Sequence, residues 1–151
     1  YESINRPTNV NRGSMDFYVE PGVKTSDNAD YANNIYDKGH LAPAATFSDN
    51  MVNLKLTFSY LNSALQNQYL NRGEWRLLEE QERKWDDAEK LTIKISVEFK
   101  NKNTVLPTGA TVPTGFTKHI YFNNQRVWKC YYFPNVKPTK KWGEHQISCN
   151  H

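Results

Sequence analysis

The clearest pattern of apolar and polar positions lies in the middle of this chain of 151 residues. Residues 72–90 repeat at about 100° per residue and predict an amphipathic helix. Its core-facing arc is expected to hold four apolar side chains: Leu77, Leu78, Trp85 and Ala88. A separate stripe, at four-residue steps on another side of the helix, is expected to form a mainly polar face: Asn71, Trp75, Glu79 and Arg83.

Strands are predicted on both sides of this helix. Residues 91–99 alternate strictly between apolar and polar side chains, which is typical of a half-buried strand. Residues 15–20 alternate weakly and predict a short strand before Pro21-Gly22. Residues 50–56 favour a short helix or turn, followed by an extended stretch over residues 57–65.

A hairpin is predicted near the C-terminus, with strands at 119–122 and 126–133 around the turn Asn123-Asn124-Gln125. Antiparallel strands combined with one long helix predict an α+β fold. No linker or internal repeat divides the sequence, so residues 1–151 are expected to form a single domain. No apolar run approaches the roughly 20 residues of a membrane span, and no membrane partner is expected.

Composition adds two expectations. The net charge of +3, with lysines gathered near the C-terminus, suits a polyanionic partner, although a solvated basic face explains the same residues: Lys137, Lys140 and Lys141. Cys130 and Cys149 can form one disulfide in an oxidising compartment. Because the sequence begins at Tyr1 without methionine, we expect a processed, exported protein that has lost its targeting segment.

One short motif is rich in chemistry. Residues 36–43 read Tyr-Asp-Lys-Gly-His-Leu-Ala-Pro and place His40 directly after Gly39. A histidine has an ordinary pKa near 6.5 and can take a proton from water at neutral pH. Gly39 is expected to let a nucleic-acid strand approach closely. Alone, such a histidine is more often a surface or packing residue.

A second segment, residues 66–75, reads Gln-Asn-Gln-Tyr-Leu-Asn-Arg-Gly-Glu-Trp and leads into the predicted helix. The amide oxygen of Asn71 is an acceptable ligand for Mg²⁺, which keeps several waters and uses few protein groups. The alternative is that Asn71 caps the helix, since asparagine favours that position. Together, the two segments resemble the DNA/RNA non-specific endonucleases, the ββα-metal (His-Me finger) nucleases whose signature reads Asp-Arg-Gly-His.

The resemblance implies a function. A protein of this family cuts DNA and RNA with little sequence preference, with His40 as the general base and Mg²⁺ on Asn71, where Mn²⁺ can substitute. Its partners are DNA and RNA, contacted through their backbones, and the family reading allows for a protein inhibitor as well. The expected fold is an antiparallel sheet with a catalytic helix.

The resemblance also implies roles for five further residues. Glu79 would hold waters around the metal ion, and Arg83 would contact the phosphate. Their plainer readings are an exposed helix glutamate and an i,i+4 ion pair. Lys38 stands where the family signature has arginine, so it keeps the charge but loses the forked contact to phosphate. Two polar positions, expected to orient the ligand or the histidine, also match: Asn62 and Gln66.

Three alternatives stay open. The domain could bind nucleic acid without cutting it, or could act as a toxin nuclease inside a target cell. A zinc site is a third reading, although its spacings match no common zinc module: Cys130, His145, Cys149 and His151.

Overall fold

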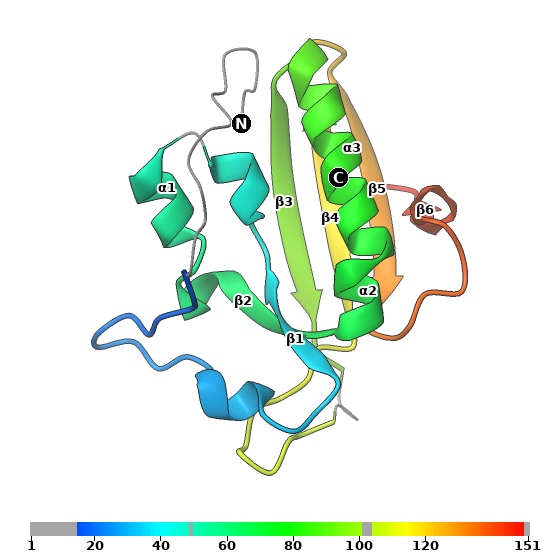
Figure 1. Cartoon of the computed structure of the whole chain (residues 1–151). Coiled ribbons are helices and arrows are strands. Elements are labelled where there is room, and N and C mark those ends of the chain that lie inside the picture. The colour runs from blue at the N-terminus through cyan, green and yellow to red at the C-terminus, as the bar shows by residue number, and fades with distance from the viewer. Residues whose placement is uncertain (1–14, 49, 101–103, 150–151) are drawn as a thin grey trace.

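The computed structural model describes residues 15–48, 50–100 and 104–149, and within them the chain forms two antiparallel sheets (Figure 1). The smaller sheet pairs two strands: β1 (Tyr36–His40) and β2 (Ser63–Asn67). The larger sheet has the order β3-β4-β5-β6. Its strands are β3 (Leu91–Glu98), β4 (Gly115–Phe122), β5 (Val127–Pro134) and β6 (Gln146–Ile147).

Helices connect and cover these sheets. The α-helices are α1 (Met51–Leu56), α2 (Gln68–Arg72) and α3 (Glu74–Ala88). Short 3-10 helices lie at Asn28–Tyr31, Ala44–Phe47, Tyr60–Asn62 and Trp142–His145. Helix α3 lies along one face of the larger sheet (Figure 1). None of the helices described has the length and apolar character needed to cross a bilayer.

The main core lies between α3 and the larger sheet. Because side chains alternate along a strand, one face of β4 and β5 supplies a row of large apolar groups to α2 and α3. The fully or nearly fully buried members are Leu70, Trp75, Leu78, Leu91, Phe116, Ile120, Phe122, Tyr131 and Phe133. This core holds α2 and α3 in a fixed position beside the β1–β2 hairpin, whose last β1 residue is His40.

The predicted helix differs from the observed one in two respects. It is broken at Gly73, where a Cβ atom would lie 2.5 Å from the carbonyl oxygen of Tyr69, so only glycine permits the joint between α2 and α3. The predicted core face is also wrong in part. Leu78 is buried and the half-buried Trp85 packs against the core, as predicted, but Ala88 is exposed. The buried residues of α3 also include Trp75, Glu79, Glu82 and Asp86.

The acidic residues on the inner face of α3 are buried because β4 supplies a cation. Lys118 Nζ lies 2.8 Å from Glu82 Oε1, and both side chains are about 1% exposed. The same ammonium group lies 4.2 Å from the centroid of the Trp75 ring. Apolar periodicity could not reveal this face because a buried ion pair has no apolar signature.

Other predicted elements have mixed outcomes. The strand at residues 91–99, the helix at 50–56 and the C-terminal hairpin are confirmed. The strand at residues 15–20 is wrong, because only one isolated bridge forms there, between Tyr18 and Ser59. The predicted disulfide between Cys130 and Cys149 is present and ties the segment after β6 to β5.

Candidate active site

A cavity of about 400 Å³ brings the two sequence motifs together. His40 and Lys38 reach it from β1, and Asn71 reaches it from α2. The remaining lining residues are Asp16, Phe17, Tyr31, Tyr36 and Asp37. The position of His40 is fixed by strand pairing, since it lies opposite Ser63 in the β1–β2 register.

The His40 ring is held on two sides by aromatic side chains. Its centroid lies 4.6 Å from that of Phe17 and 4.8 Å from that of Phe58, the latter in an edge-on arrangement. The ring is half-buried and lines the cavity, while its Nε2 atom is buried. A general base needs a ring nitrogen within reach of the attacking water, and this role stays a prediction for His40.

Asn71 lies inside α2 and is not a helix cap. The cap of α2 is Asn67, whose side-chain oxygen accepts hydrogen bonds from the backbone amides of Tyr69 and Leu70 at 2.9 and 3.3 Å. The Nδ2 group of Asn71 donates to Asp37 Oδ2 at 2.9 Å. This bond uses the nitrogen end of the amide, so the oxygen end remains for a cation.

Asp37 is the centre of a small hydrogen-bond network. Besides the Asn71 amide, it accepts two bonds from one guanidinium group, Arg72 Nε to Oδ2 at 2.9 Å and Arg72 Nη2 to Oδ1 at 2.8 Å. This forked contact fixes the carboxylate plane and offsets its charge. The oxygen donors around the cavity are of the kind that Mg²⁺ and Mn²⁺ prefer.

Lys38 does not point freely into solvent. Its Nζ lies 3.2 Å from Asp16 Oδ1 and about 6 Å from the Phe17 and Tyr60 rings. Burial alone would lower the pKa of Lys38, but the hydrogen bond and charge of Asp16, together with Tyr60, raise it. The ammonium group therefore stays charged beside the cavity, and its contact with phosphate stays a prediction.

Glu79 is buried in α3, which rules out the exposed helix glutamate as its environment. Burial raises its pKa to about 7, and the nearby Lys118, Arg83 and Arg76 oppose this shift while Glu82 adds to it. Glu79 is not among the residues that line the cavity with His40. Its role in holding water around a metal ion stays a prediction.

Arg83 lies on α3 one turn after Glu79 and reaches the segment that follows the histidine motif. Its Nη1 donates to Thr46 Oγ1 at 3.3 Å. Thr46 belongs to the 3-10 helix Ala44–Phe47, just beyond the Leu-Ala-Pro sequence after His40. Arg83 is thus positioned from both α3 and this segment, and its contact with phosphate stays a prediction.

Asn62 and Gln66 support the histidine motif from behind. Asn62 exchanges hydrogen bonds with the Ala42 backbone, Oδ1 accepting at 2.8 Å and Nδ2 donating at 2.9 Å, and so fixes the turn after His40. Gln66 is buried against Gly39, where a Cβ atom would lie 2.4 Å from Gln66 Oε1. These positions favour orientation of the histidine, and direct contact with substrate stays a prediction for both.

The expected role of Gly39 is therefore wrong. Gly39 is buried and makes room for Gln66 of the neighbouring strand, so it is not a point of close approach for nucleic acid. Substitution by alanine would push the two strands apart behind His40. The need for glycine is a packing need within the hairpin.

The sequence motifs did not reveal four residues at this site. Asp16, Phe17 and Tyr31 line the cavity, but the weak alternation over residues 15–20 predicted only a strand there, and Tyr31 lies in no predicted element. Arg72 was read only as the start of a helix, although its position next to Asn71 was a usable signal. Of the C-terminal lysines, Lys137 lies near α2, with its Nζ 5.0 Å from the Tyr69 ring.

The zinc alternative does not fit the described part of the chain. Cys130 and Cys149 are bonded to each other and offer no thiolate. The Nδ1 atom of His145 lies 2.9 Å from the Tyr132 carbonyl oxygen, and its ring stacks on Phe133. No group of three potential His, Cys, Asp or Glu ligands occurs among the described residues, and His151 lies outside them.

Comparison with known proteins identifies the family of this chain. The family model for DNA/RNA non-specific endonucleases matches residues 2–151. A curated relative, the mitochondrial endonuclease G of Bos taurus, is 37% identical over 76 residues. That match covers 48% of this chain but only 25% of the relative, so the chain spans about a quarter of its length.

A solved structure shows the same fold. It is the crystal structure of an EndoG/EndoGI complex, described as revealing the mechanism of EndoG inhibition. The TM-score is 0.74 at 22% identity, and the match covers 97% of this chain and 68% of the other. The α+β architecture, with antiparallel sheets and a helix along the larger one, is thereby confirmed as a ββα-metal nuclease fold. The chain belongs to the DNA/RNA non-specific endonuclease family.

Proposed function

We propose that this protein is a metal-dependent endonuclease that hydrolyses phosphodiester bonds of DNA and RNA with little sequence preference. The observation that carries the proposal is the shared cavity, which is lined by a histidine packed between aromatic rings, an oriented asparagine amide and a charged lysine. Family membership and the similarity to endonuclease G support the reaction class.

His40 is the proposed general base. Its ring is fixed between Phe17 and Phe58 and faces the cavity, so it can take a proton from the attacking water. The ring nitrogen then carries that proton while the phosphorus–oxygen bond breaks. Because the neutral ring is the active form, cleavage should rise with pH through the histidine range.

Asn71 is the proposed metal ligand. Its amide oxygen is left available by the bond from Nδ2 to Asp37, and the surrounding oxygen donors suit Mg²⁺ or Mn²⁺. When bound, the divalent ion supplies positive charge to the phosphate as negative charge develops on it. Asp37 and Arg72 keep the amide in place.

Lys38 and Arg83 are the proposed phosphate contacts. Lys38 lines the cavity, and Arg83 reaches the segment behind it from α3. Contacts of this kind recognise the backbone of a nucleic acid and carry no sequence information. Glu79 is proposed to hold water near the metal site, and Asn62 and Gln66 to hold the histidine motif.

Replacing His40 by alanine tests the proposal most directly. A plasmid-nicking assay with Mg²⁺, with and without chelator, should show chelator-sensitive cleavage that His40→Ala lowers by roughly 10²–10⁴-fold. His119→Ala is the matched control, since His119 lies on β4 and does not line the cavity. Near-normal cleavage by His40→Ala would refute this assignment, and nucleic-acid binding without cleavage by the wild type would favour a binding module.

Export and inhibition are further parts of the proposal. The disulfide between Cys130 and Cys149 suits an oxidising compartment and supports an exported protein. The structural neighbour is an EndoG/EndoGI complex, which supports a search for a protein inhibitor of this chain. The free energy of unfolding, measured at increasing concentrations of reducing agent, tests the importance of the disulfide. A pull-down with the His40→Ala variant as bait tests for a protein inhibitor.

A further inference from the structure

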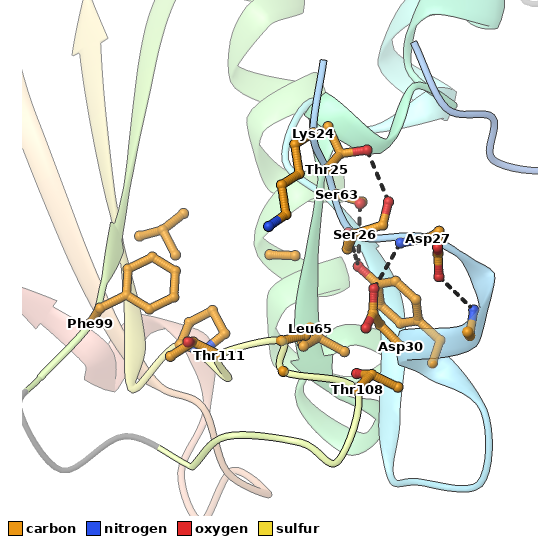
Figure 2. Close-up of a pocket in the computed structure, with 17 residues that line it drawn as sticks. Lys24, Thr25, Ser26, Asp27, Asp30, Ser63, Leu65, Phe99, Thr108 and Thr111 are labelled. Atoms are coloured by element: carbon orange, nitrogen blue, oxygen red, sulfur yellow. Dashed lines mark hydrogen bonds between the residues drawn. The ribbon is translucent and has the colours of Figure 1, made fainter. Parts of the chain in front are cut away.

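A second cavity, larger than the one beside His40, lies elsewhere in the described part of the molecule. It has a volume of about 1070 Å³ and lies between the segment 24–31, strand β2 and residues from two further stretches, 97–99 and 108–113. Figure 2 shows Phe99 and Thr111 on one side, and Lys24, Ser26 and Asp30 on the other. Lys24 extends its ammonium group into the space between them (Figure 2).

Tyr31 connects this cavity to the catalytic one, because it lines both. The Tyr31 hydroxyl lies 3.2 Å from Ser63 Oγ and 3.4 Å from Ser26 Oγ, and Ser63 is the strand partner of His40. The two cavities therefore border the same side chain, two hydrogen-bond or strand contacts away from His40.

The lining suits a flat, mainly apolar group with polar edges. Its walls include apolar side chains and the ring of Phe99, which is 57% exposed: Leu65, Val97, Phe99 and Pro113. Around these lie hydroxyl groups, which can both donate and accept hydrogen bonds: Thr25, Ser26, Thr108 and Thr111. An exposed aromatic ring can stack on a base of any identity, because every base has a π-face.

The charge of the lining argues against a second phosphate site. Two carboxylates and one ammonium group line the cavity, from Asp27, Asp30 and Lys24. The carboxylates are engaged locally, since Asp27 Oδ1 accepts from the Ala29 amide at 2.9 Å and Asp30 Oδ2 from the Asp27 amide at 2.8 Å. An environment with this balance would repel a phosphate more than it would a neutral base or sugar.

We propose that this cavity binds an unpaired nucleobase, with its sugar, from the nucleotide next to the phosphate that is cut. The proposal rests on the proposed endonuclease function and deepens it. The base stacks on Phe99, and the hydroxyl groups satisfy its edge whichever base is present, so the site adds affinity without sequence preference. A base in a duplex is paired and cannot enter, so single strands gain most from the site.

Abasic oligonucleotides test the proposal. A set of single-stranded oligonucleotides, each with one cleavable linkage, carries an abasic nucleotide at successive positions on either side of it. For the wild type, kcat/KM should fall roughly five-fold to a hundred-fold when the missing base is the one that fills the cavity. Phe99→Ala should show the same loss on the intact strand and no further loss on that abasic strand.

Two controls separate this proposal from the function beneath it. Trp128→Ala removes an exposed aromatic side chain of β5 that lines neither cavity and should leave every rate unchanged. Bis(4-nitrophenyl) phosphate has no base, so Phe99→Ala should hydrolyse it as fast as the wild type. Loss of that hydrolysis in Phe99→Ala would mean general damage and would overturn the base site.

The remaining outcomes are also decisive. If the wild type cleaves the strands but is indifferent to abasic positions, and Phe99→Ala cleaves them normally, the base site is wrong while the endonuclease function stands. If the wild type cleaves no strand with Mg²⁺ or Mn²⁺, the proposed function fails and the base site fails with it. Equal losses on duplexes and single strands would overturn the claim that the bound base is unpaired.

Discussion

Asp37 and Glu79 are both carboxylates beside the α2–α3 helix pair, but they lie in opposite environments. Asp37 is near the surface, where the Arg72 guanidinium grips both of its oxygens and the Asn71 amide adds a third bond. Glu79 is buried on the inner face of α3, and burial raises its pKa to about 7. One acid is therefore bound by a guanidinium and an amide, and the other is buried with a raised pKa.

This difference gives the Asp37 network and the inner face of α3 different roles. The Asp37 network positions a group in the catalytic cavity at little cost in desolvation, because Arg72 is 67% exposed. The inner face of α3 instead carries charged side chains that are buried in the core, where the stability of each one depends strongly on its ion-pair partners. Substitutions in the Asp37 network should change metal affinity and leave the free energy of unfolding nearly unchanged. Substitutions on the inner face of α3 should change the free energy of unfolding and leave metal affinity nearly unchanged.

The largest expected effect comes from removing the buried cation. Lys118→Met leaves Glu82 without its partner in the core, next to Glu79 and Asp86, which are also buried. Loss of one member of a buried pair costs about 3–5 kcal/mol. Urea unfolding followed by fluorescence should show this fall in the free energy of unfolding.

A double variant provides the control for Lys118. Replacing both partners with apolar residues, as Lys118→Met with Glu82→Leu, removes the unpaired charge as well as the pair, and should recover most of the loss. A single Lys118→Met variant within about 1 kcal/mol of the wild type would show that the ion pair does not stabilise this face.

Glu79 should give the second-largest effect, and it depends on pH. Its folded-state pKa of about 7 lies above its ordinary value of 4.5, so the folded protein binds a proton that the unfolded chain has released. The contribution of Glu79 is fully present below pH 4.5 and is lost as pH rises to about 7, amounting to about 3 kcal/mol. Stability of the metal-free protein should fall across this window.

Glu79→Gln isolates that contribution. The variant cannot ionise, so the difference in unfolding free energy between it and the wild type should grow with pH in favour of the variant. Glu80→Gln is the matched control, because Glu80 is partly exposed and pairs with Arg76 at the surface. Parallel curves for wild type and Glu79→Gln between pH 4.5 and 7 would contradict the assigned environment.

The same contrast explains what the sequence could predict. Regular alternation located β3 and the β4–β5 hairpin, and two motifs located His40 and Asn71, because local patterns determine these features. The inner face of α3 was not predictable, since Glu82 becomes a core residue only when β4 brings Lys118 against it. Long-range pairing of charge leaves no periodic signal.

The catalytic cavity shows a similar division. Motif spacing predicted that His40 and Asn71 belong together, and both line it. The walls formed by Phe17 and Tyr31 depend on how an irregular segment packs across the hairpin, which no local rule specifies. Gly39 was misread because the sequence cannot show that Gln66 fills the space in front of it.

The third prediction concerns the hydrogen-bond network around Asp37. Arg72→Gln removes a positive charge from beside Asp37 while the Asn71–Asp37 bond remains possible. Mn²⁺ should then bind more tightly, by about 1 kcal/mol or roughly five-fold, because a cation no longer opposes it. Titration calorimetry measures this directly, and unfolding free energy should change by less than about 1 kcal/mol.

Arg76→Gln is the control for net charge. Arg76 lies one turn further along, pairs with Glu80 and does not line the cavity, so its replacement should leave Mn²⁺ affinity unchanged. Weaker Mn²⁺ binding by Arg72→Gln would mean that the guanidinium orients the site more than its charge opposes the ion.

The smallest expected effect lies at the edge of the catalytic cavity, where Asp16 holds Lys38. The two groups are 3.2 Å apart and the Asp16 side chain is 75% exposed, so the pair itself contributes at most about 1 kcal/mol to stability. A substrate phosphate must compete with Asp16 for the same ammonium group. Asp16→Asn should therefore lower KM for an oligonucleotide a few-fold at low salt, with kcat unchanged, and the gain should disappear at high salt.

Glu144→Gln removes an equal charge from an exposed site that does not line the cavity and should leave KM nearly constant. An unchanged KM in Asp16→Asn would show that Lys38 does not contact the phosphate, and a change in kcat alone would place Lys38 in the chemical step.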